Sequence, residues 1–304
     1  MRIASFNLQN LRLRGDRLDG ARDTDTPGDS GARAARLDPA DRRLTAAVLR
    51  DTGADVVALQ EVFDRATLDA FHDRLLVPSG TPPYPHRVCL PGNDGRGLDV
   101  ALMSRLPLRD IRSHAALTPR DLGLEPPPGQ DPDAPVFRRD CLQARTGALT
   151  LFICHFKAPY PDPDSAAAIR RMEAQAVRGI ITRAFPDPAA ALWLVLGDLN
   201  EPVEADPPAI APLLPPFSVD LVARLPADRR WSWFEPHGAL YGQPDSLLAS
   251  PALAARFPAA RPEILREGLG LEARCNRGPH LPEVGHHRPH ASDHAALVVE
   301  FPGL

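Results

Sequence analysis

Short apolar segments of strand length recur along the chain and alternate with amphipathic helical patterns, and this alternation limits the fold more than any other feature. The strand-like segments are residues 2–7, 55–60, 87–90, 99–104, 141–145, 150–155, 192–196, 246–249 and 295–301. Apolar side chains at helical spacing occur at residues 41–52, 66–76 and 165–185. Short buried strands interleaved with helices are typical of α/β proteins. We therefore expect an α/β fold.

Three stretches interrupt this alternation, at residues 11–38, 118–135 and 263–291. A chain of 304 residues is long enough for one large domain or two small ones. None of the three stretches has the composition and flanking pattern of a linker between domains. We interpret them as long loops of one domain, residues 1–304, and long loops in compact domains are often functional.

The composition is that of a globular protein, with 43% hydrophobic and 24% charged residues. No apolar run approaches the roughly 18 residues that a membrane-spanning helix needs. The first residues lack the apolar segment of a signal peptide, so we expect a cytoplasmic protein with no membrane association. A formal net charge of -4 argues against strong non-specific binding of nucleic acid but is compatible with a local basic groove.

Polar side chains stand at one end of most predicted strands. They are Asn7, Glu61, His155, Lys157, Asp198, Asn200, Asp245, Asp293 and His294. A packed sheet gathers the ends of its strands at one rim, so these residues can converge although they are far apart in the sequence.

The types of these side chains indicate a chemistry. Carboxylate and amide oxygens with few histidines and no cysteine suit Mg²⁺ or Mn²⁺ better than zinc. A carboxylate-bound divalent cation beside a histidine that is oriented by another carboxylate suits the attack of water on a phosphate. The cation and a protonated imidazole both offset negative charge that develops on the phosphoryl oxygens.

The same residues occur in motifs that follow one another in a known order. The motifs are residues 5–11 (SFNLQNL), 59–61 (LQE), 97–105 (GLDVALMSR), 155–157 (HFK), 197–200 (GDLN), 244–248 (PDSLL) and 292–294 (SDH). Together they resemble the endonuclease/exonuclease/phosphatase superfamily, over almost the whole chain. The resemblance implies a four-layer α/β sandwich, with two mixed β-sheets packed face to face, helices outside and the active site at one rim.

The resemblance also implies roles for single residues. Glu61 matches the metal-binding glutamate of the family, and Asn7 and Asp293 are its expected neighbours in a site for one or two Mg²⁺ or Mn²⁺ ions. Asp198 matches the aspartate that positions or deprotonates the attacking water. Asn200 matches the asparagine that holds the scissile phosphate.

Two acid–histidine pairs are implied in the same way. Asp245 and His294 match the pair in which the carboxylate keeps the imidazole oriented and protonated. Asp99 and His155 stand at the positions of a second pair found in the deoxyribonuclease-like branch. Lys157 follows His155 by two residues and so points to the same face of a strand, where it can reach a substrate phosphate or a metal-ligand carboxylate.

Lys157 is conspicuous because it is the only lysine among 35 basic residues. A compact, strongly hydrated ammonium is not equivalent to a planar guanidinium in a tight polar site, which favours a functional role for Lys157. Arg138 and Arg139 precede a strand and could touch a phosphate. With 34 arginines in the chain, we expect both of them to be solvated.

A histidine-rich segment near the end of the chain allows two interpretations. His286, His287 and His290 follow Cys275 and His280, a set that could bind zinc. Their spacing matches no known zinc pattern. We favour a solvated loop.

These residues predict an enzyme, a Mg²⁺- or Mn²⁺-dependent phosphoesterase that cuts phosphodiester bonds by direct attack of activated water. We expect a nuclease that acts on DNA or RNA. The alternatives are a small-molecule or lipid phosphohydrolase of the same fold and, less favoured because no motif residue is lost, a non-catalytic binding protein. No obligate protein partner is evident in the sequence.

Overall fold

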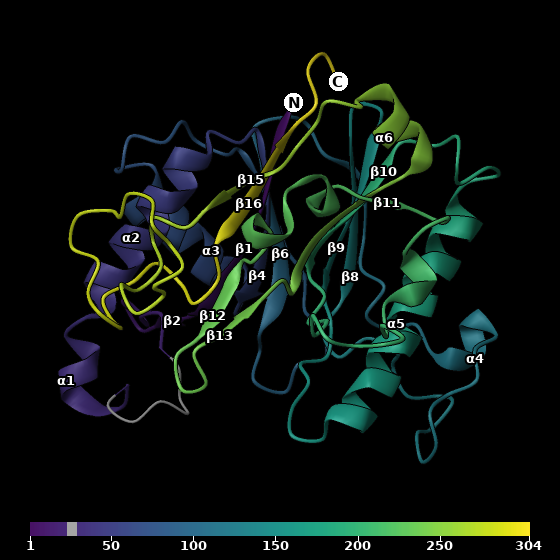
Figure 1. Cartoon of the computed structure of the whole chain (residues 1–304), viewed down its shortest axis with the longest axis horizontal. Coiled ribbons are helices and arrows are strands. Elements are labelled where there is room, and N and C mark those ends of the chain that lie inside the picture. The colour runs from purple at the N-terminus through teal and green to yellow at the C-terminus, as the bar shows by residue number, and fades with distance from the viewer. Residues whose placement is uncertain (23–28) are drawn as a thin grey trace.

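Two six-stranded mixed sheets form the centre of the computed structural model, which describes residues 1–22 and 29–304 (Figure 1). The first sheet has the strand order β15-β16-β1-β4-β6-β5. Its strands are β1 (Arg2–Leu11), β4 (Val56–Val62), β5 (His86–Cys89), β6 (Asp99–Ser104), β15 (Glu263–Leu265) and β16 (Ala296–Glu300). Strand β1 runs parallel to β4 and antiparallel to β16, so the sheet is mixed.

The second sheet has the order β11-β14-β10-β9-β8-β7. Its strands are β7 (Arg109–Arg112), β8 (Cys141–Thr146), β9 (Leu149–His155), β10 (Trp193–Asp198), β11 (Val219–Asp220) and β14 (Asp245–Ala249). Strand β10 is parallel to β9 and antiparallel to β14. Two short hairpins complete the strands, β2–β3 (Leu13–Arg14 and Arg17–Leu18) and β12–β13 (Trp233–Glu235 and Leu240–Gly242).

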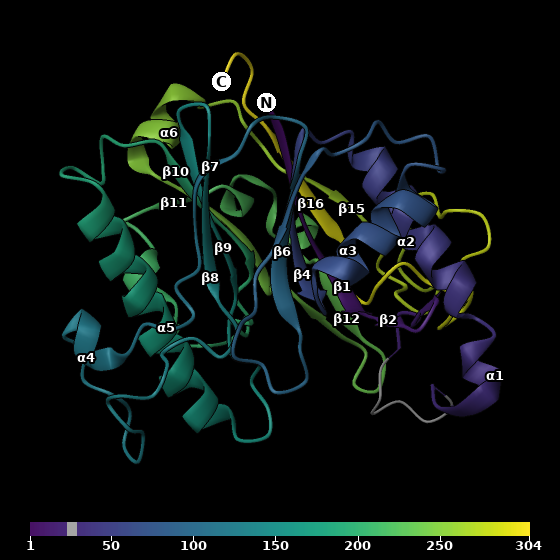
Figure 2. The same cartoon turned by 180° about the vertical axis from the view of Figure 1, so that it is seen from behind.

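Helices cover the outer faces of both sheets (Figures 1 and 2). The α-helices are α1 (Gly31–Ala35), α2 (Asp38–Thr52), α3 (Arg65–Phe71), α4 (Pro119–Leu122), α5 (Pro163–Ala184) and α6 (Pro251–Arg256). A π-helical turn, η1 (His72–Leu76), continues α3, and short 3-10 turns are η2 (Ala211–Leu213), η3 (Val222–Arg224) and η4 (Ala227–Arg229). Within the described residues, no helix combines the length and the apolar character that crossing a bilayer requires.

Three apolar clusters hold these layers together. The central cluster joins the inner faces of the two sheets and includes Ile3 and Leu102 from the first and Leu194 from the second. A second cluster packs Val48 of α2 on the outer face of the first sheet, and a third packs Val177 of α5 on the outer face of the second. The layers are therefore helix, sheet, sheet and helix, which confirms the predicted four-layer sandwich.

All of the predicted strands and helices are present, with small changes at their ends. Strand β1 continues to Leu11, beyond the predicted end at residue 7. The predicted helix at residues 66–76 is an α-helix that becomes π-helical at His72. The segments at 11–38, 118–135 and 263–291 are not loops throughout, because they contain β2, β3 and α1, then α4, and then β15. Residues 23–28 of the first segment lie outside the described residues.

Two of these segments meet in a buried charged cluster, and the prediction of a solvated histidine loop is wrong there. The Arg288 guanidinium is buried and donates to Asp38 Oδ1 at 3.0 Å and, through Nε, to Asp41 Oδ2 at 2.9 Å. The His287 ring lies between Glu272 and Asp29, with nitrogen–oxygen distances of 2.6 and 3.1 Å. His290 is buried against the carbonyl oxygen of Ala21, and only His286 is exposed. The cluster joins segments about 250 residues apart, a contact that local sequence does not reveal.

Candidate active site

Three polar residues lie side by side at the end of the second sheet because of the strand register. Asp198 of β10 is paired with His155 of β9 on one side and with Asp245 of β14 on the other. Gly197 is paired with Cys154, and a Cβ atom on Gly197 would lie 2.0 Å from the Cys154 carbonyl oxygen. Glycine is therefore required at position 197, because only glycine lets β9 and β10 come close enough to place His155, Asp198 and Asp245 side by side.

The first sheet contributes Asn7 and Glu61 from its two central strands. Glu61 has a φ of +62°, in the left-handed region, at the irregularity where the pairing of β4 with its neighbours shifts. A non-glycine residue in this region costs free energy and is common at functional sites. The Asn10 backbone N–H donates to Glu61 Oε2 at 2.8 Å and fixes the carboxylate.

Asn7 connects the two sheets across the rim. Its Nδ2 donates to Asp198 Oδ2 at 3.1 Å and lies 3.4 Å from Glu61 Oε1. Its Oδ1 accepts from the Gln9 backbone N–H at 3.0 Å, which leaves the amide nitrogen facing the two carboxylates. Asn7 is thus a hydrogen-bond donor to Asp198 and Glu61.

The carboxylate of Asp198 is the centre of the site. Its Oδ2 lies 3.6 Å from His155 Nε2 and 3.8 Å from His294 Nε2, and its Oδ1 accepts from the Asn200 backbone N–H at 2.9 Å. Asp198 is buried, and burial raises the pKa of its carboxyl group. A buried carboxylate with a raised pKa and imidazoles within 4 Å is a candidate proton acceptor.

His294 and Asp245 form the predicted pair. His294 Nδ1 lies 2.9 Å from Asp245 Oδ2, which also accepts from the Ser232 hydroxyl at 2.6 Å. Burial opposes a charge on His294, but the carboxylates of Asp245, Asp293 and Asp198 raise its pKa well above the ordinary value. These carboxylates therefore favour the protonated form of the His294 imidazole.

His155 has the opposite character, and its predicted hydrogen bond with Asp99 is not made. Burial, with the nearby Arg139 guanidinium, lowers the pKa of His155 well below its usual range, and its Nδ1 has no hydrogen-bond partner among the described residues. Asp99 instead accepts from the Gly92 backbone N–H at 2.9 Å. Burial raises the pKa of Asp99 to about 6. His155 is thus a neutral imidazole beside Asp198.

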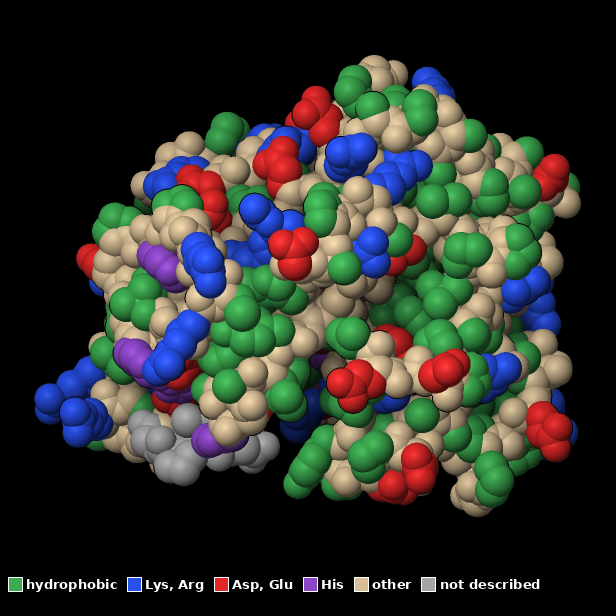
Figure 3. Space-filling model, in the orientation of Figure 1, with side chains coloured by type: hydrophobic (Ala, Val, Ile, Leu, Met, Phe, Trp, Pro, Cys, Tyr) green, Lys and Arg blue, Asp and Glu red, His purple; other side chains and the backbone are tan. Residues whose placement is uncertain are grey.

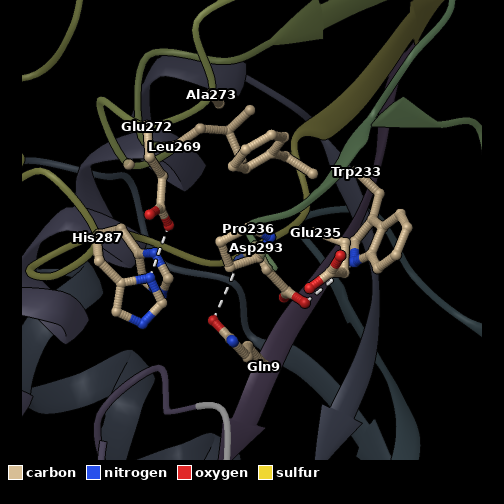
Figure 4. A pocket seen from close by; sticks show the side chains of 12 residues that line it. Gln9, Trp233, Glu235, Pro236, Leu269, Glu272, Ala273, His287 and Asp293 are labelled. Atoms are coloured by element: carbon tan, nitrogen blue, oxygen red, sulfur yellow. Dashed lines mark hydrogen bonds and ion pairs between the residues drawn. The ribbon is translucent and has the colours of Figure 1, made fainter. Parts of the chain in front are cut away.

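Two carboxylates at the rim, Glu61 and Asp293, have no basic partner within salt-bridge distance in the described part of the chain. The Asp293 carboxylate accepts from Trp233 Nε1 at 3.2 Å, and its backbone N–H donates to Gln9 Oε1 at 3.1 Å (Figure 4). Residues 1–22 and 29–304 hold no group of three or more His, Cys, Asp or Glu side chains in metal-binding geometry. Mg²⁺ typically uses one or two carboxylates and completes its shell with water and phosphate oxygens, so Glu61 and Asp293 fit such an ion.

Lys157 and Asn200 lie at the ends of β9 and β10, beside this centre. The ammonium of Lys157 donates to the carbonyl oxygen of Ala158 at 2.9 Å and to that of Tyr160. Asn200, with a φ of +53°, donates through Nδ2 to the Phe156 carbonyl oxygen at 3.1 Å. Each side chain keeps a further N–H for a ligand, because an ammonium has three and an amide two.

Several residues of the site do not stand out in the sequence. Trp233, besides its bond to Asp293, has its ring 6.5 Å from the His294 ring, centroid to centroid. Arg139 is buried rather than solvated as predicted, with Nη1 2.9 Å from the Phe156 carbonyl oxygen and Nε 3.1 Å from Asp94. Tryptophan is rare, with three in the chain, and this rarity could have drawn attention to Trp233. Gln9 could have been found because it lies inside the first motif, residues 5–11.

Comparison with known proteins agrees with this arrangement. The model of the Endonuclease/Exonuclease/phosphatase family matches residues 4–294. No curated protein matches the sequence significantly.

Solved structures match over nearly the whole chain at low identity. A humanized D. rerio TDP2 with 14 mutations is 19% identical, with a TM-score of 0.59 and coverage of 98% of this chain and 97% of that one. An AP endonuclease from Archaeoglobus fulgidus is 15% identical, with a TM-score of 0.59 and 99% of both chains covered. A mannosyl-6-phosphatase from Bacteroides thetaiotaomicron is 14% identical, with a TM-score of 0.58 and coverage of 99% and 98%. These similarities establish the fold, and the family match over 4–294 establishes that the chain belongs to the endonuclease/exonuclease/phosphatase family of phosphoesterases.

Proposed function

We propose that the protein is a Mg²⁺- or Mn²⁺-dependent phosphodiesterase and that its substrate is a nucleic acid. The observation that carries the proposal is the position of the Asp198 carboxylate. It lies between the imidazoles of His155 and His294, whose pKa values are shifted in opposite directions, at the rim that also carries the Glu61 and Asp293 carboxylates.

Asp198 acts as the proton acceptor for the attacking water. Its Oδ1 is fixed by the Asn200 backbone, and the Asn7 amide fixes Oδ2. A water molecule that hydrogen-bonds to this carboxylate is oriented for attack, and a buried base with a raised pKa accepts its proton more readily.

His294 acts as the donor to the phosphate. Asp245 holds its Nδ1, so the Nε2–H of the imidazolium points into the site, on the side of Asp198. A positive charge held there stabilises the negative charge that develops on the phosphoryl oxygens. Asn200 and Lys157 provide further N–H donors to the phosphate.

Glu61 and Asp293 would hold the divalent ion. When bound, such an ion neutralises charge on the phosphate oxygens and lowers the pKa of bound water. The fixed Glu61 carboxylate and the hydrogen-bonded Asp293 carboxylate supply the hard oxygen donors that Mg²⁺ and Mn²⁺ prefer.

A nucleic-acid substrate is supported by structural neighbours, although the neighbours are not uniform. They include the AP endonuclease and a 3' phosphatase from Neisseria bound to a product DNA hairpin, but also the mannosyl-6-phosphatase. A small-molecule or lipid phosphohydrolase is therefore the second candidate.

A substrate panel distinguishes the candidates. Purified protein is incubated with Mg²⁺, Mn²⁺ or EDTA and with single-stranded DNA, double-stranded DNA, RNA, bis(p-nitrophenyl) phosphate, a sugar phosphate or a phospholipid analogue. We expect metal-dependent cleavage of the diesters and of at least one nucleic acid. Turnover of only the sugar phosphate or the phospholipid would establish the second candidate, and no turnover of any diester would refute the proposal.

A further inference from the structure

A wide cavity lies outside the candidate active site, between the β12–β13 hairpin, the segment 227–231 and the loop 264–279. Its volume is about 1180 Å³. Pockets for small molecules measure about 300–1,000 Å³, so this cavity has room for more than one small ligand.

Basic side chains dominate the wall of this cavity. The arginines are Arg229, Arg230, Arg266, Arg274 and Arg277, and the acidic residues are Asp228 and Glu267. The wall thus has three more positive than negative charges, in a chain with a net charge of -4. On the face drawn in Figure 3, basic and hydrophobic side chains alternate over the region where Figure 1 places β12, β13 and β15.

Two of these arginines have no partner within the described residues. Arg274 and Arg277 are exposed, and neither makes a salt bridge or a side-chain hydrogen bond with any residue of 1–22 or 29–304. Arg229 has only a loose contact with Asp228, 3.9 Å between two exposed side chains. The positive charge of the cavity is therefore available to an anionic ligand.

Aromatic rings and a fixed guanidinium form the floor between these arginines. The Arg266 guanidinium lies 4.3 Å from the Trp231 ring centroid and donates to the carbonyl oxygens of Trp231 and Arg229. The Trp231 and Tyr241 rings meet edge to face at 5.0 Å. Arginines interleaved with aromatic side chains are the usual means of binding single-stranded nucleic acid, through phosphate contacts and base stacking.

The cavity adjoins the candidate active site through the β12–β13 hairpin, because Gly242 lines the cavity and is paired with Trp233, which donates to Asp293. Val203 also lines the cavity and follows Asn200 by three residues, and Gln243 lines it two residues before Asp245. A strand whose scissile phosphate lies at Asp198 can therefore continue into the cavity.

We propose that this cavity binds a single-stranded segment of the nucleic-acid substrate, remote from the phosphate that is cut. The inference rests on the proposed function and adds to it a substrate class, single-stranded or unpaired nucleic acid. A flexible single strand can place its phosphates against Arg274 and Arg277 and stack its bases on the Trp231 and Tyr241 rings, whereas the bases of a duplex are stacked inside the helix.

The test is the salt dependence of oligonucleotide binding. Anisotropy of a labelled oligothymidylate is measured in EDTA, over a range of salt concentrations, for the wild type and for Arg274→Ala/Arg277→Ala. Each lost phosphate contact makes the slope of log K against log salt less negative by about 0.7, so we expect a change of about 1.4 for the double variant. Hydrolysis of bis(p-nitrophenyl) phosphate by the same variant should equal that of the wild type.

A matched control removes two exposed arginines elsewhere, Arg109→Ala/Arg112→Ala on β7, the strand at the far edge of the second sheet. This control should bind with the wild-type slope. Equal slopes for the cavity variant and the wild type would overturn the inference, as would equally salt-dependent binding of a duplex. The two proposals can fail separately. If the wild-type protein hydrolyses no diester but the cavity variant binds the oligonucleotide more weakly than the wild type, the cavity site is supported and the proposed function is refuted.

Discussion

His294 Nδ1 lies 2.9 Å from Asp245 Oδ2, although His294 comes just before β16 of the first sheet and Asp245 begins β14 of the second. This contact therefore closes the site between the sheets. Among the carboxylates that raise the pKa of His294, Asp245 contributes most, so its charge favours the imidazolium form.

Replacement of Asp245 by Asn should therefore lower kcat with little effect on KM. Asparagine keeps an oxygen for the Ser232 hydroxyl but removes the charge that favours the imidazolium. Loss of a preorganised stabilising group at a developing negative charge costs about 10²–10³-fold in kcat. Steady-state kinetics on a diester measure the change, and the alkaline limb of the pH–rate profile should move to lower pH.

Asp220→Asn is the matched control for Asp245→Asn. Asp220 is also a strand carboxylate of the second sheet, half-buried on β11 beside β14, and its Oδ1 accepts from the Val222 backbone N–H at the start of η3. Its substitution should leave kcat unchanged. If Asp245→Asn also retained wild-type kcat, the role assigned to His294 would be wrong.

Replacement of Glu61 by Gln should weaken the binding of a divalent ion. The substitution keeps the shape of the side chain and removes one of the two negative charges that face the rim. We expect the Mn²⁺ concentration for half-maximal activity to rise by about 10–100-fold. Direct Mn²⁺ binding, measured by electron paramagnetic resonance, should show the same loss without any substrate.

Glu300→Gln provides the comparison for Glu61→Gln, because Glu300 is an exposed carboxylate at the end of β16. It should bind Mn²⁺ like the wild type. Unchanged Mn²⁺ binding in Glu61→Gln would remove Glu61 from the metal site.

The alternation of apolar strands with helices predicted an α/β fold, and the resemblance of the motifs to a known family implied the four-layer sandwich with its active site at one rim. Apolar strands with polar ends determine which residues reach the rim, and parallel pairing of β9 with β10 aligns His155 with Asp198. The positions of the strands follow from the local pattern of apolar residues, whereas the pairing of β9 with β10 is known from the structure.

Contacts that depend on the path of loops could not be predicted in the same way. Asp99 begins β6 as expected, but the backbone of Gly92 approaches its carboxylate and takes the hydrogen bond that was expected for His155. The burial of Arg288 depends on acidic residues about 250 positions earlier. The pattern of apolar and polar residues does not show that the segment of Asp38 and Asp41 contacts the segment of Arg288.

Replacement of Gly197 by Ala should strongly destabilise the fold. Gly197 has a φ of +136°, and a Cβ atom there would lie 2.0 Å from the Cys154 carbonyl oxygen, so β9 and β10 must separate. We expect a loss of roughly 3 kcal/mol or more in the free energy of unfolding, from backbone strain and overpacking together. Urea denaturation of the wild type and the variant measures this loss in the free energy of unfolding.

Gly147→Ala separates the effect of backbone strain from that of the close contact. Gly147 also has a positive φ, +54°, but a Cβ atom there meets nothing within 4 Å. It should cost only about 1 kcal/mol. Similar losses for the two variants would mean that the contact between β9 and β10 is not what requires glycine at 197.

Buried His290 should make the fold sensitive to mild acid. Its ring contacts the Ala21 carbonyl oxygen and faces His287, Arg288 and Asp29, and burial lowers its pKa to about 3. The unfolded chain binds a proton at this histidine below about pH 6.5, whereas the folded chain does not until about pH 3. The unfolded state therefore binds more protons between these values, and stability falls as the pH falls.

His290→Gln tests this linkage, since glutamine can still donate to the Ala21 carbonyl oxygen but does not titrate. Wild-type stability should fall by roughly 1–2 kcal/mol more than that of the variant between pH 6.5 and pH 5. His287, whose pKa is raised by Glu272 and Asp29 against the effect of burial, is present in both proteins and contributes with the opposite sign. Urea titrations at several pH values measure the two slopes, and parallel slopes would show that His290 is protonated in the folded protein.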